Sequence, residues 1–272
     1  MLDADISSYF DTIPHDKLQI VLKLRISDLR ILELINLWLK AAVYEDGQYK
    51  GGKKQKTGTP QGGVISPLLA NIYLHLVDRI VSNTKKLFYQ AGVKMVRYAD
   101  DFVLMAKRIT KEIEDSLRSV LERMGLSLNE NKTRKVQAEE SPFNFLGFTV
   151  RYDEDLKGRS KKYLNITPTE KSGKKIREKI KLFLKKSGHY RPSLVAKELN
   201  TLMRGWLNYY DIPGVSYPAK SKRMLRHYLI ERLYRYYNRK SQRRSCLYGL
   251  QAFDILVCHY GLIDPTKYNV RH

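Results

Sequence analysis

The spacing of apolar and polar positions predicts several strands in the first half of the chain. Residues 1–6 have the composition of the end of a strand. Two short apolar runs at 93–98 and 102–106 flank a tight turn at residues 99–101, as expected for a hairpin. Residues 143–150, with the sequence FNFLGFTV, are predicted to form a further strand.

Helical periodicity appears between these strands. Residues 110–124 repeat apolar positions on one helical face, which comprises Ile113, Leu117, Val120, Leu121 and Met124, and Gly125 then ends the helix. The apolar-rich stretches 16–43 and 66–89 are predicted as helices, and the Gly- and Lys-rich stretch 45–59 as a hairpin or loop. Because helices and hairpins are mixed, we expect an α+β fold.

The second half of the chain has helical periodicity almost throughout. Ser193 is predicted to cap the second of its three helices. Basic residues surround the apolar faces, which indicates a small helical bundle with a basic exterior. The faces comprise Ile176, Ile180, Phe183 and Leu184, then Val195, Leu199, Leu202, Met203 and Trp206, and then Leu225, Leu229 and Leu233.

Charge divides the chain into two parts. The 272 residues include 50 Lys and Arg against 28 Asp and Glu, a formal net charge of +22. Residues 1–150 have a net charge of +4, whereas residues 151–272 have +18 and contain 13 of the 19 tyrosines. We place the join in the polar stretch 153–164. A surplus of this size favours an anionic partner, either nucleic acid or an anionic membrane face.

The composition also excludes several classes of protein. With 43% hydrophobic residues the chain can form a core, so wholesale disorder is excluded. Two cysteines, Cys246 and Cys258, form neither a disulfide framework nor a zinc site, and they fit a reducing compartment. No apolar run reaches the roughly 18 residues of a membrane span, and the N-terminus lacks the pattern of a signal peptide.

Three carboxylates lie where strands are predicted to end. Asp100 and Asp101 occupy the turn in VRYADDFVLM, and Asp5 follows the strand-like start of the chain. Carboxylates that meet at strand ends can hold two Mg²⁺ ions and support phosphoryl transfer. Adjacent acids are also ordinary turn residues, and Asp3 shares a strand face with Asp5. Local sequence therefore leaves both the role and the choice of ligand open.

A second candidate segment is GTPQGGVISPLLANIYLH, at residues 58–75. Its three glycines let the backbone pass close to a ligand, and Gln61 offers both a donor and an acceptor. A helix that begins near Ser66 would direct N–H groups toward a phosphate or a base. A plain turn followed by a helix cap is the alternative for the same residues.

Together these segments resemble the reverse transcriptases of the group II intron maturase type. The resemblance implies a reverse-transcriptase palm, a ferredoxin-like antiparallel sheet with helices, over residues 1–152. An all-α thumb and maturase-specific domain would follow over residues 165–272. The matching segments keep the family's order across nearly the whole chain: DADISSYFDTIPHDKL at 3–18, GTPQGGVISPLLANIYL at 58–74, RYADD at 97–101, GLSLNENKT at 125–133, FNFLGF at 143–148 and GWLNYY at 205–210.

The resemblance implies roles for the acids. Asp5 and Asp100 match the two aspartates that bind the catalytic metals, here two Mg²⁺ ions, and Asp101 completes the acidic set. Ile6 would contribute its backbone carbonyl to a metal. His15, which follows this segment, is expected to be a buried or turn histidine and not a ligand.

Further matches concern the nucleotide and the primer. Phe10, five residues after Asp5, matches the aromatic residue that crowds the sugar 2′ position and favours deoxynucleotides. Gln61, Gly62 and Lys132 match positions beside the incoming nucleotide. Local sequence alone also allows Phe10 as a core residue and Lys132 as a solvated lysine. FNFLGF resembles the primer-grip turn, which would comprise Phe145, Leu146 and Gly147.

The basic helices are expected to bind RNA. The implied partners are group II intron RNA, an RNA template with a DNA primer, and dNTPs, with no membrane partner. Tyrosines among the arginines suit stacking on unpaired bases, and an aromatic core is the alternative for each. The expected contacts are Lys174, Lys175, Lys179, Arg204, Arg223, Arg226, Arg235 and Arg239.

Only four residues precede Asp5, where the family carries fingers that grip the nucleotide. We therefore expect a partial palm, and weak or absent primer extension by this chain alone. The expected location is cytoplasmic, in a bacterium or in association with an organellar nucleoid. Two other functions fit the composition: a non-enzymatic RNA-binding splicing factor or degenerate relic, and a generic basic nucleic-acid protein.

Overall fold

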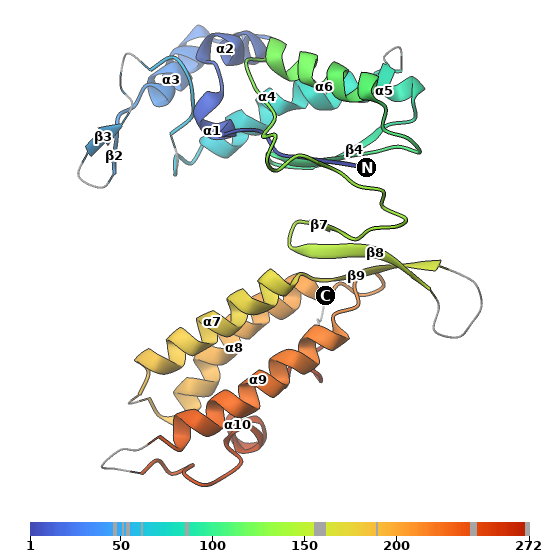
Figure 1. The fold of residues 1–272 in the computed structure, drawn as a ribbon. Coiled ribbons are helices and arrows are strands. Elements are labelled where there is room, and N and C mark those ends of the chain that lie inside the picture. Colours follow the sequence, from blue (N-terminus) through green and yellow to red (C-terminus); the bar gives the residue numbers. More distant parts are fainter. Residues whose placement is uncertain are drawn as a thin grey trace. The chain divides into compact units, whose positions relative to one another are not determined.

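The chain forms two compact units, Met1–Gln137 and Ala138–His272. Each unit has its own hydrophobic core, and Figure 1 labels the elements for which there is room. The computed structural model describes residues 1–45, 48–50, 52, 55–60, 62–84, 87–154, 162–188, 190–239 and 244–269.

A four-stranded antiparallel sheet is the centre of the first unit. Its strand order is β4-β5-β1-β6, and two helices connect the strands so that the chain runs β1-α4-β4-β5-α6-β6. This is the order of the ferredoxin-like β-α-β-β-α-β unit, as expected. The elements are β1 (Leu2–Ala4), α4 (Ser66–Val81), β4 (Lys94–Tyr98), β5 (Asp101–Met105), α6 (Lys111–Arg123) and β6 (Arg134–Lys135).

Both connecting helices lie on one face of this sheet. Side chains alternate between the faces of a strand, and Leu2 and Ala4 share a face with their β5 partners Leu104 and Phe102. All four are buried in one core with the apolar sides of α4 and α6. The predicted face of α6 is confirmed, because its apolar residues are buried: Ile113, Leu117, Val120, Leu121 and Met124.

The rest of the first unit differs from the predicted pattern at two places. The predicted helical stretch 16–43 ends early, since α3 ends at Leu39 and Val43 begins a strand. The predicted helix 66–89 is interrupted, since α4 ends at Val81 and a short α5 begins at Leu87. Ser82, Asn83 and Thr84 lie between them, and such side chains compete for backbone hydrogen bonds and favour helix ends. The other elements are α1 (Tyr9–Thr12), α2 (His15–Lys23), α3 (Leu29–Leu39), β2 (Val43–Glu45), β3 (Gln48–Lys50) and α5 (Leu87–Gln90).

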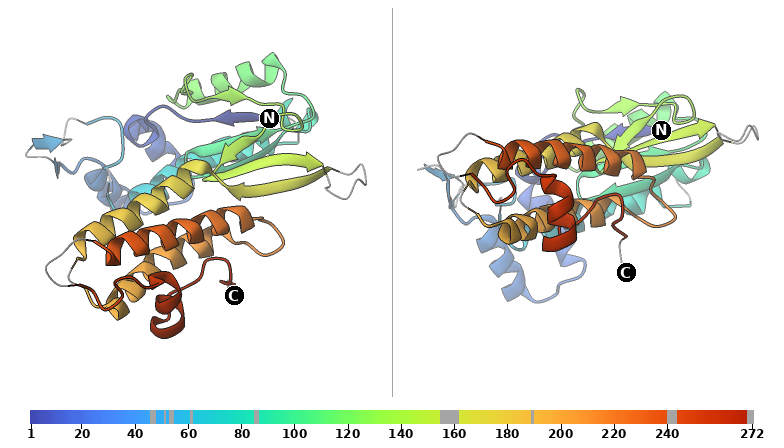
Figure 2. Two further views of the ribbon diagram at one scale, coloured as in Figure 1. Left: turned by 60° about the horizontal axis from the view of Figure 1, so that its bottom comes forward. Right: turned by 90° about the horizontal axis from the view of Figure 1, so that it is seen from below.

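The second unit combines a small sheet with a helical bundle. Strands β7, β8 and β9 form an antiparallel sheet in chain order. Figures 1 and 2 show α7, α8 and α9 side by side, and α10 packs against α8 and α9. The elements are β7 (Phe143–Phe145), β8 (Phe148–Glu154), β9 (Lys162–Pro168), α7 (Glu170–Lys186), α8 (Pro192–Tyr210), α9 (Ala219–Tyr237) and α10 (Ala252–Tyr260).

The predicted apolar faces of this bundle are confirmed. The core of the second unit contains residues from each of the three predicted helices. Phe183 and Leu202 pack against this core while remaining partly exposed. The buried members are Ile176, Ile180, Leu184, Val195, Leu199, Met203, Trp206, Leu225, Leu229 and Leu233.

One prediction for this region is wrong. Residues 143–150 form a hairpin instead of one strand, because Leu146 and Gly147 turn the chain. The predicted join at 153–164 lies in the region of the paired strands β8 and β9, while the compact units divide after residue 137. After β9 ends at Pro168, the elements of the described C-terminal residues are helices, as expected.

The start of α8 also differs from the prediction. Arg191 is its N-cap residue and Pro192 is in its first turn, so Ser193 lies inside the helix. Proline suits this position because the first N–H groups of a helix have no partner within it. No helix among the described residues combines the length and the apolar composition that a membrane span requires.

Candidate functional site

Acidic side chains from two neighbouring strands meet on the sheet face opposite α4 and α6. The antiparallel register of β1 and β5 ends at the pair Ala4 and Phe102. Continued by one residue, it brings Asp5 opposite Asp101, and opposed side chains point to the same face. Asp100 lies in the two-residue turn between β4 and β5.

These carboxylates repel one another. Partial burial, followed by the charges of Asp100 and Asp5, raises the pKa of Asp101. Burial and then the charge of Asp101 also raise the pKa of Asp3. We name Asp3, Asp5, Asp100 and Asp101 the acidic cluster. Because the ionised forms of Asp3 and Asp101 are disfavoured, a cation would bind favourably at the acidic cluster.

Lys132 lies beside the acidic cluster. Ile6 forms a β-bridge with Leu128, and the amide of Asn129 donates to the carbonyl of Asp5 at 2.8 Å. These backbone contacts bring the following residues close to Asp5. Nζ of Lys132 is 3.1 Å from Oδ2 of Asp5, although 67% of the lysine side chain is exposed.

The turn that carries Asp100 is held from the helix side of the sheet. Ala99 has a φ of 54°, in the left-handed region that residues with a side chain rarely adopt. Nη1 of Arg97 donates to the Ala99 carbonyl and to Oδ1 of Asn71, each at 2.9 Å. Nε and Nη2 donate to the two carboxylate oxygens of Asp78 at 2.9 and 2.6 Å. Hydrogen bonding to Asp78 raises the pKa of Arg97, so the guanidinium stays charged.

Phe10 connects the first segment to the predicted nucleotide-binding loop. Its ring packs partly buried against the core and lies edge-on to Tyr9, with centroids 5.6 Å apart. The Phe10 carbonyl accepts from the amide of Thr59 at 2.6 Å, and the Ile13 carbonyl accepts from the amide of Gly58 at 2.8 Å. The loop therefore begins directly against α1.

Close packing fixes the course of this loop. A Cβ at Gly58 would meet the backbone of α1 at 2.9 Å, and one at Gly63 would meet Oγ of Ser66 at 2.7 Å. Gly62 has a φ of 83°, with open space where a Cβ would lie. Gln61 lies outside the described residues, so its role stays a prediction.

His15 is the buried histidine that the sequence predicts. Its side chain lies 2.6 Å, through Nε2, from the carbonyl oxygen of Gly58, and the residue is 6% exposed. It therefore attaches α2 to the start of the loop and is not a member of the acidic cluster.

The acidic cluster fits Mg²⁺ by the chemistry of its donors. Mg²⁺ is commonly bound by one or two carboxylates together with substrate phosphates and water. No three His, Cys, Asp or Glu side chains of the described ranges form a preformed metal cage. Asp5 and Asp101 nevertheless present two carboxylates from opposed positions, and their repulsion favours a divalent cation.

In the second unit, α8 supports the predicted primer-grip turn. Leu146 and Gly147 have φ values of 49° and 79°, a geometry typical of two-residue hairpin turns. The Tyr209 hydroxyl donates to the Leu146 carbonyl at 2.9 Å, and the Tyr209 ring stacks on Phe148. A Cβ at Gly147 would meet the hydroxyl oxygen of Tyr210 at 2.5 Å. The GWLNYY segment therefore supports the FNFLGF segment.

Burial distinguishes tyrosines of the aromatic core from tyrosines that could stack on RNA bases. Tyr210 and Tyr237 are core residues, 9% and 4% exposed. Tyr236 is partly buried and its hydroxyl donates to the Ser187 carbonyl at 2.5 Å. Tyr234 is 53% exposed and remains available to a partner.

Two of the predicted RNA-binding arginines make contacts within the second unit. Nε of Arg226 donates to Asp264 at 3.1 Å, and its guanidinium lies over the ring of Phe253. Arg239 donates to the carbonyl of Gly188. Both side chains therefore stabilise the unit, whatever else they bind.

The other predicted RNA-binding residues are exposed. Lys174 pairs with Glu170 at 3.0 Å, and Arg235 lies 3.8 Å from Glu231, both along exposed helix faces. Such exposed pairs contribute little to stability. The remaining exposed side chains are Lys175, Lys179, Arg204 and Arg223.

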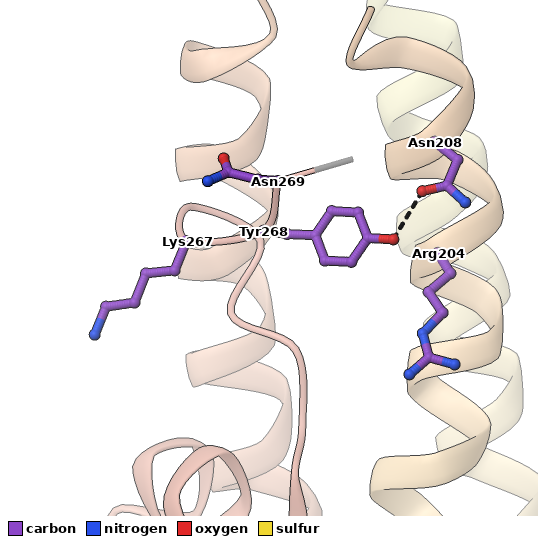
Figure 3. Close-up of a pocket in the computed structure, with 5 residues that line it drawn as sticks. All are labelled: Arg204, Asn208, Lys267, Tyr268 and Asn269. Carbon is purple, nitrogen blue, oxygen red and sulfur yellow. Dashed lines mark hydrogen bonds between the residues drawn. The ribbon is translucent and has the colours of Figure 1, made fainter. Parts of the chain in front are cut away.

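The segment after α10 returns to α8. The side chain of Asn200 donates to the Gly261 carbonyl and accepts from the Ile263 amide, each at 2.8 Å. Further along, the Tyr268 hydroxyl donates to Oδ1 of Asn208 at 2.8 Å (Figure 3). These bonds attach the C-terminal segment to the face of α8.

A cleft of about 490 Å³ lies beside this attachment. In Figure 3 the side chain of Lys267 points away from Arg204, so these two cations do not converge on one point. The cleft adds basic surface next to α8 without forming a single anion site. It is lined by Arg204, Asn208, Lys267, Tyr268 and Asn269.

Comparison with known families identifies the chain. The model of the reverse transcriptase (RNA-dependent DNA polymerase) family matches residues 1–150, which is more than half of the chain. The chain therefore belongs to the reverse transcriptase family. The model of the group II intron maturase-specific domain matches residues 173–249, so the resemblance seen in the sequence is confirmed for both parts.

Curated relatives agree with these matches. Group II intron-encoded protein LtrA of Lactococcus lactis subsp. cremoris is 29% identical over 210 residues, covering 55% of this chain and 34% of that protein. Protein YkfC of Escherichia coli (strain K12) is 35% identical over 177 residues, covering 54% and 45%. An uncharacterized 91 kDa protein in the cob intron of Schizosaccharomyces pombe is 27% identical over 280 residues, covering 77% and 34%. The chain spans less than half the length of each relative.

Two supporting contacts have little or no signal in the sequence. Arg97 lies within the quoted RYADD segment, but nothing marked it as the residue that holds the turn. One feature could have indicated this role. Arg97 is a charged residue at a strand position that faces the helices, where its β5 partner Phe102 is buried. The bond from Tyr209 to Leu146 has no signal in the sequence, because it joins positions 63 residues apart.

A substitution at Gly147 tests the support of the hairpin turn. We expect Gly147→Ala to destabilise the second unit by about 1–3 kcal/mol, because a side chain is strained at this φ and also meets Tyr210. Gly214→Ala is a matched control, since Gly214 has a φ of 74° and open space around it. Chemical denaturation should show the larger loss for Gly147→Ala. Adding Tyr210→Phe should recover part of that loss, and no recovery would contradict the contact.

Repulsion within the acidic cluster predicts a dependence of stability on pH. A folded protein in which the pKa of Asp101 is raised binds that proton more tightly than the unfolded chain does. Its stability is therefore higher below the folded pKa and falls as pH rises through it. In the presence of a chelator, Asp101→Asn should raise the melting temperature at pH 7.

This gain should shrink as pH falls toward about 4, the ordinary range of aspartate. The control is Asp115→Asn, on the exposed side of α6, which should give no gain. A gain for Asp101→Asn that is independent of pH would show that charge repulsion is not its cause.

Proposed function

We propose that the protein is an RNA-directed DNA polymerase of a group II intron that also binds intron RNA as a maturase. One observation carries the proposal: Asp5 and Asp101 lie at opposed strand positions next to Asp100. Lys132 lies beside them. Membership of the reverse transcriptase family and the maturase-specific match support it. The proposed substrates are dNTPs and a DNA primer on an RNA template.

In the proposed mechanism, Asp5, Asp100 and Asp101 would hold two Mg²⁺ ions, and the backbone carbonyl of Ile6 would be a further ligand. These ions, when bound, supply the charge that activates the primer hydroxyl and stabilises the leaving pyrophosphate. The carboxylates orient the site, because they extend from strand ends that the core holds in register. Lys132 would exchange its contact with Asp5 for the triphosphate, since its side chain is largely exposed.

Other residues of the chain would position the substrates. Phe10 would limit space at the sugar 2′ position, and Gln61 and Gly62 would lie against the nucleotide and the template. The turn of Phe145, Leu146 and Gly147 would hold the primer end. The contact of this turn with α8 supports that role, because a fixed turn positions a primer better than a mobile one.

The proposed partner of the second unit is intron RNA. The charge of +18 over residues 151–272 and the exposed lysines on α7 support RNA binding through phosphates. The same observation favours a second candidate function, a splicing factor that binds RNA without polymerising DNA. The two differ in whether the acidic cluster is needed.

Removal of one carboxylate separates these functions. We expect Asp100→Ala to lower Mg²⁺-dependent dNTP incorporation on an RNA template by at least about 100-fold. Loss of a residue that only orients a metal ligand already lowers metal affinity or activity by about 10–100-fold. RNA affinity should not change. The control is Asp115→Ala, which removes a carboxylate from the exposed side of α6. Because extension by this chain alone is expected to be weak, the assay must detect wild-type incorporation above background. Equal incorporation by Asp100→Ala in that assay would contradict the polymerase proposal and leave the splicing factor.

The salt dependence of RNA binding tests the basic surface. The triple variant Lys175→Gln, Lys179→Gln and Arg223→Gln should weaken binding and reduce the slope of log K against log salt. The expected reduction is about 2, from about 0.7 for each phosphate contact on a single strand. A matched triple variant in the first unit, at Lys107, Arg108 and Lys111, removes the same charge from exposed positions. Equal slopes for the two variants would contradict a specific role for α7 and α9.

A further inference from the structure

Residues other than glycine rarely have a positive φ, and where they do here they fall in segments that carry the family resemblance. Within the described ranges these residues are Ser8, Ala99 and Leu146. Left-handed backbone at such residues is unfavourable and persists only where the surroundings hold it. Ala99 directly precedes Asp100, so its conformation decides the direction in which that carboxylate leaves the turn.

Arg97 is the side chain that holds Ala99. Its guanidinium is fixed by Asp78 and Asn71, which are seven residues apart and therefore two turns apart on one side of α4. Only 14% of the Arg97 side chain is exposed. The remaining hydrogen bond goes to the Ala99 carbonyl, at 2.9 Å. The orientation of that peptide is thus set by α4, through a planar group that has little freedom to move.

Arg97 does not act on the acids directly. Its β5 partner is Phe102, which faces the helices, whereas Asp101 is one position along the strand and faces the other side. We propose that Arg97 is a positioning residue that fixes the Ala99 peptide to α4 and so directs Asp100 toward its cation. The proposal rests on the proposed function to the extent that Asp100 is a metal ligand.

Charge and position predict opposite effects of losing Arg97. Removal of a positive charge near carboxylates strengthens the binding of a cation if only the electric field matters. Loss of the hydrogen bond to Ala99 weakens binding if the turn relaxes and misdirects Asp100. A positioning role therefore predicts weaker metal binding in Arg97→Gln, against the electrostatic trend.

Ala99→Gly supplies the specific test of position. Glycine adopts a positive φ without the steric cost that alanine has, so the turn needs less support. We expect Arg97→Gln to weaken Mn²⁺ binding by about 10-fold, as loss of groups that orient ligands commonly does. The double variant Arg97→Gln, Ala99→Gly should recover most of the loss. A residue that merely joins β4 to α4 would not be rescued in this way.

The measurement is a titration of the full chain with Mn²⁺ followed by electron paramagnetic resonance. Asp100→Ala defines the signal of the proposed site, and Arg79→Gln controls for loss of a positive charge from α4. Arg79→Gln should bind Mn²⁺ like the wild-type chain. Circular dichroism should confirm that each variant folds. If Arg97→Gln does not fold, Arg97→Lys keeps the charge, and a smaller loss with the same rescue is expected.

The outcomes distinguish the two levels of the proposal. Unchanged or tighter Mn²⁺ binding in Arg97→Gln, or a loss that Ala99→Gly does not recover, overturns the role of Arg97 and leaves the proposed function intact. Equal Mn²⁺ binding by the wild-type chain and Asp100→Ala overturns the metal site itself, and the role of Arg97 with it.

Discussion

β1 contributes only three residues to its sheet, yet its pairing with β5 decides which side chains meet the helices. The side-chain period of a strand is two, so a shift of one residue would exchange the two faces. Asp3 and Asp5 would then face the core, and Leu2 and Ala4 would leave it. The cost of burying unpaired carboxylates is large enough to exclude that arrangement. The apolar residues of β1 thus fix the positions of its acids.

The same pairing brings like charges together at the expense of stability. Burial and then repulsion raise the pKa of Asp101 and of Asp3, and Lys132 offsets the rise at Asp101 only from an exposed position. The buried sides of α4 and α6 stabilise the sheet against this repulsion. Sites that must bind charged ligands commonly oppose the stability of their fold in this way. The interior of the first unit and its acidic face therefore have opposite effects on folding.

Periodicity predicted the elements that bury one face. It failed where a few residues decide whether the chain turns or continues. The strong face of α6 and the three faces of the bundle are confirmed, because each repeats over several turns. The hairpin at FNFLGF was missed because Leu-Gly is an unusual pair for a tight turn, which more often carries Asn-Gly. β9 was missed as well, because its apolar and polar residues alternate only weakly. α10 was missed because it is short.

The candidate site was predictable to the extent that it consists of contiguous segments. The segments DADI and YADD identified acids that the register brings together, although the choice between Asp3 and Asp5 needed the family resemblance. The supports of these segments were not predictable. Asp78 and Arg97 are 19 residues apart, and nothing local indicates that they form a pair. Contacts of this kind follow from the packing of helices on the sheet, which the sequence pattern describes only in outline.

The bond between Tyr209 and Leu146 has a consequence for how such proteins can be recombined. The two family models divide the chain between residues 150 and 173, so FNFLGF falls on one side and GWLNYY on the other. In the folded chain these segments share one hydrogen bond and one stacked aromatic pair within a single compact unit. A chimera joined between the matched regions would take the turn from one parent and its support from another. Exchange between relatives is therefore tolerated best at residue 137, where the compact units divide.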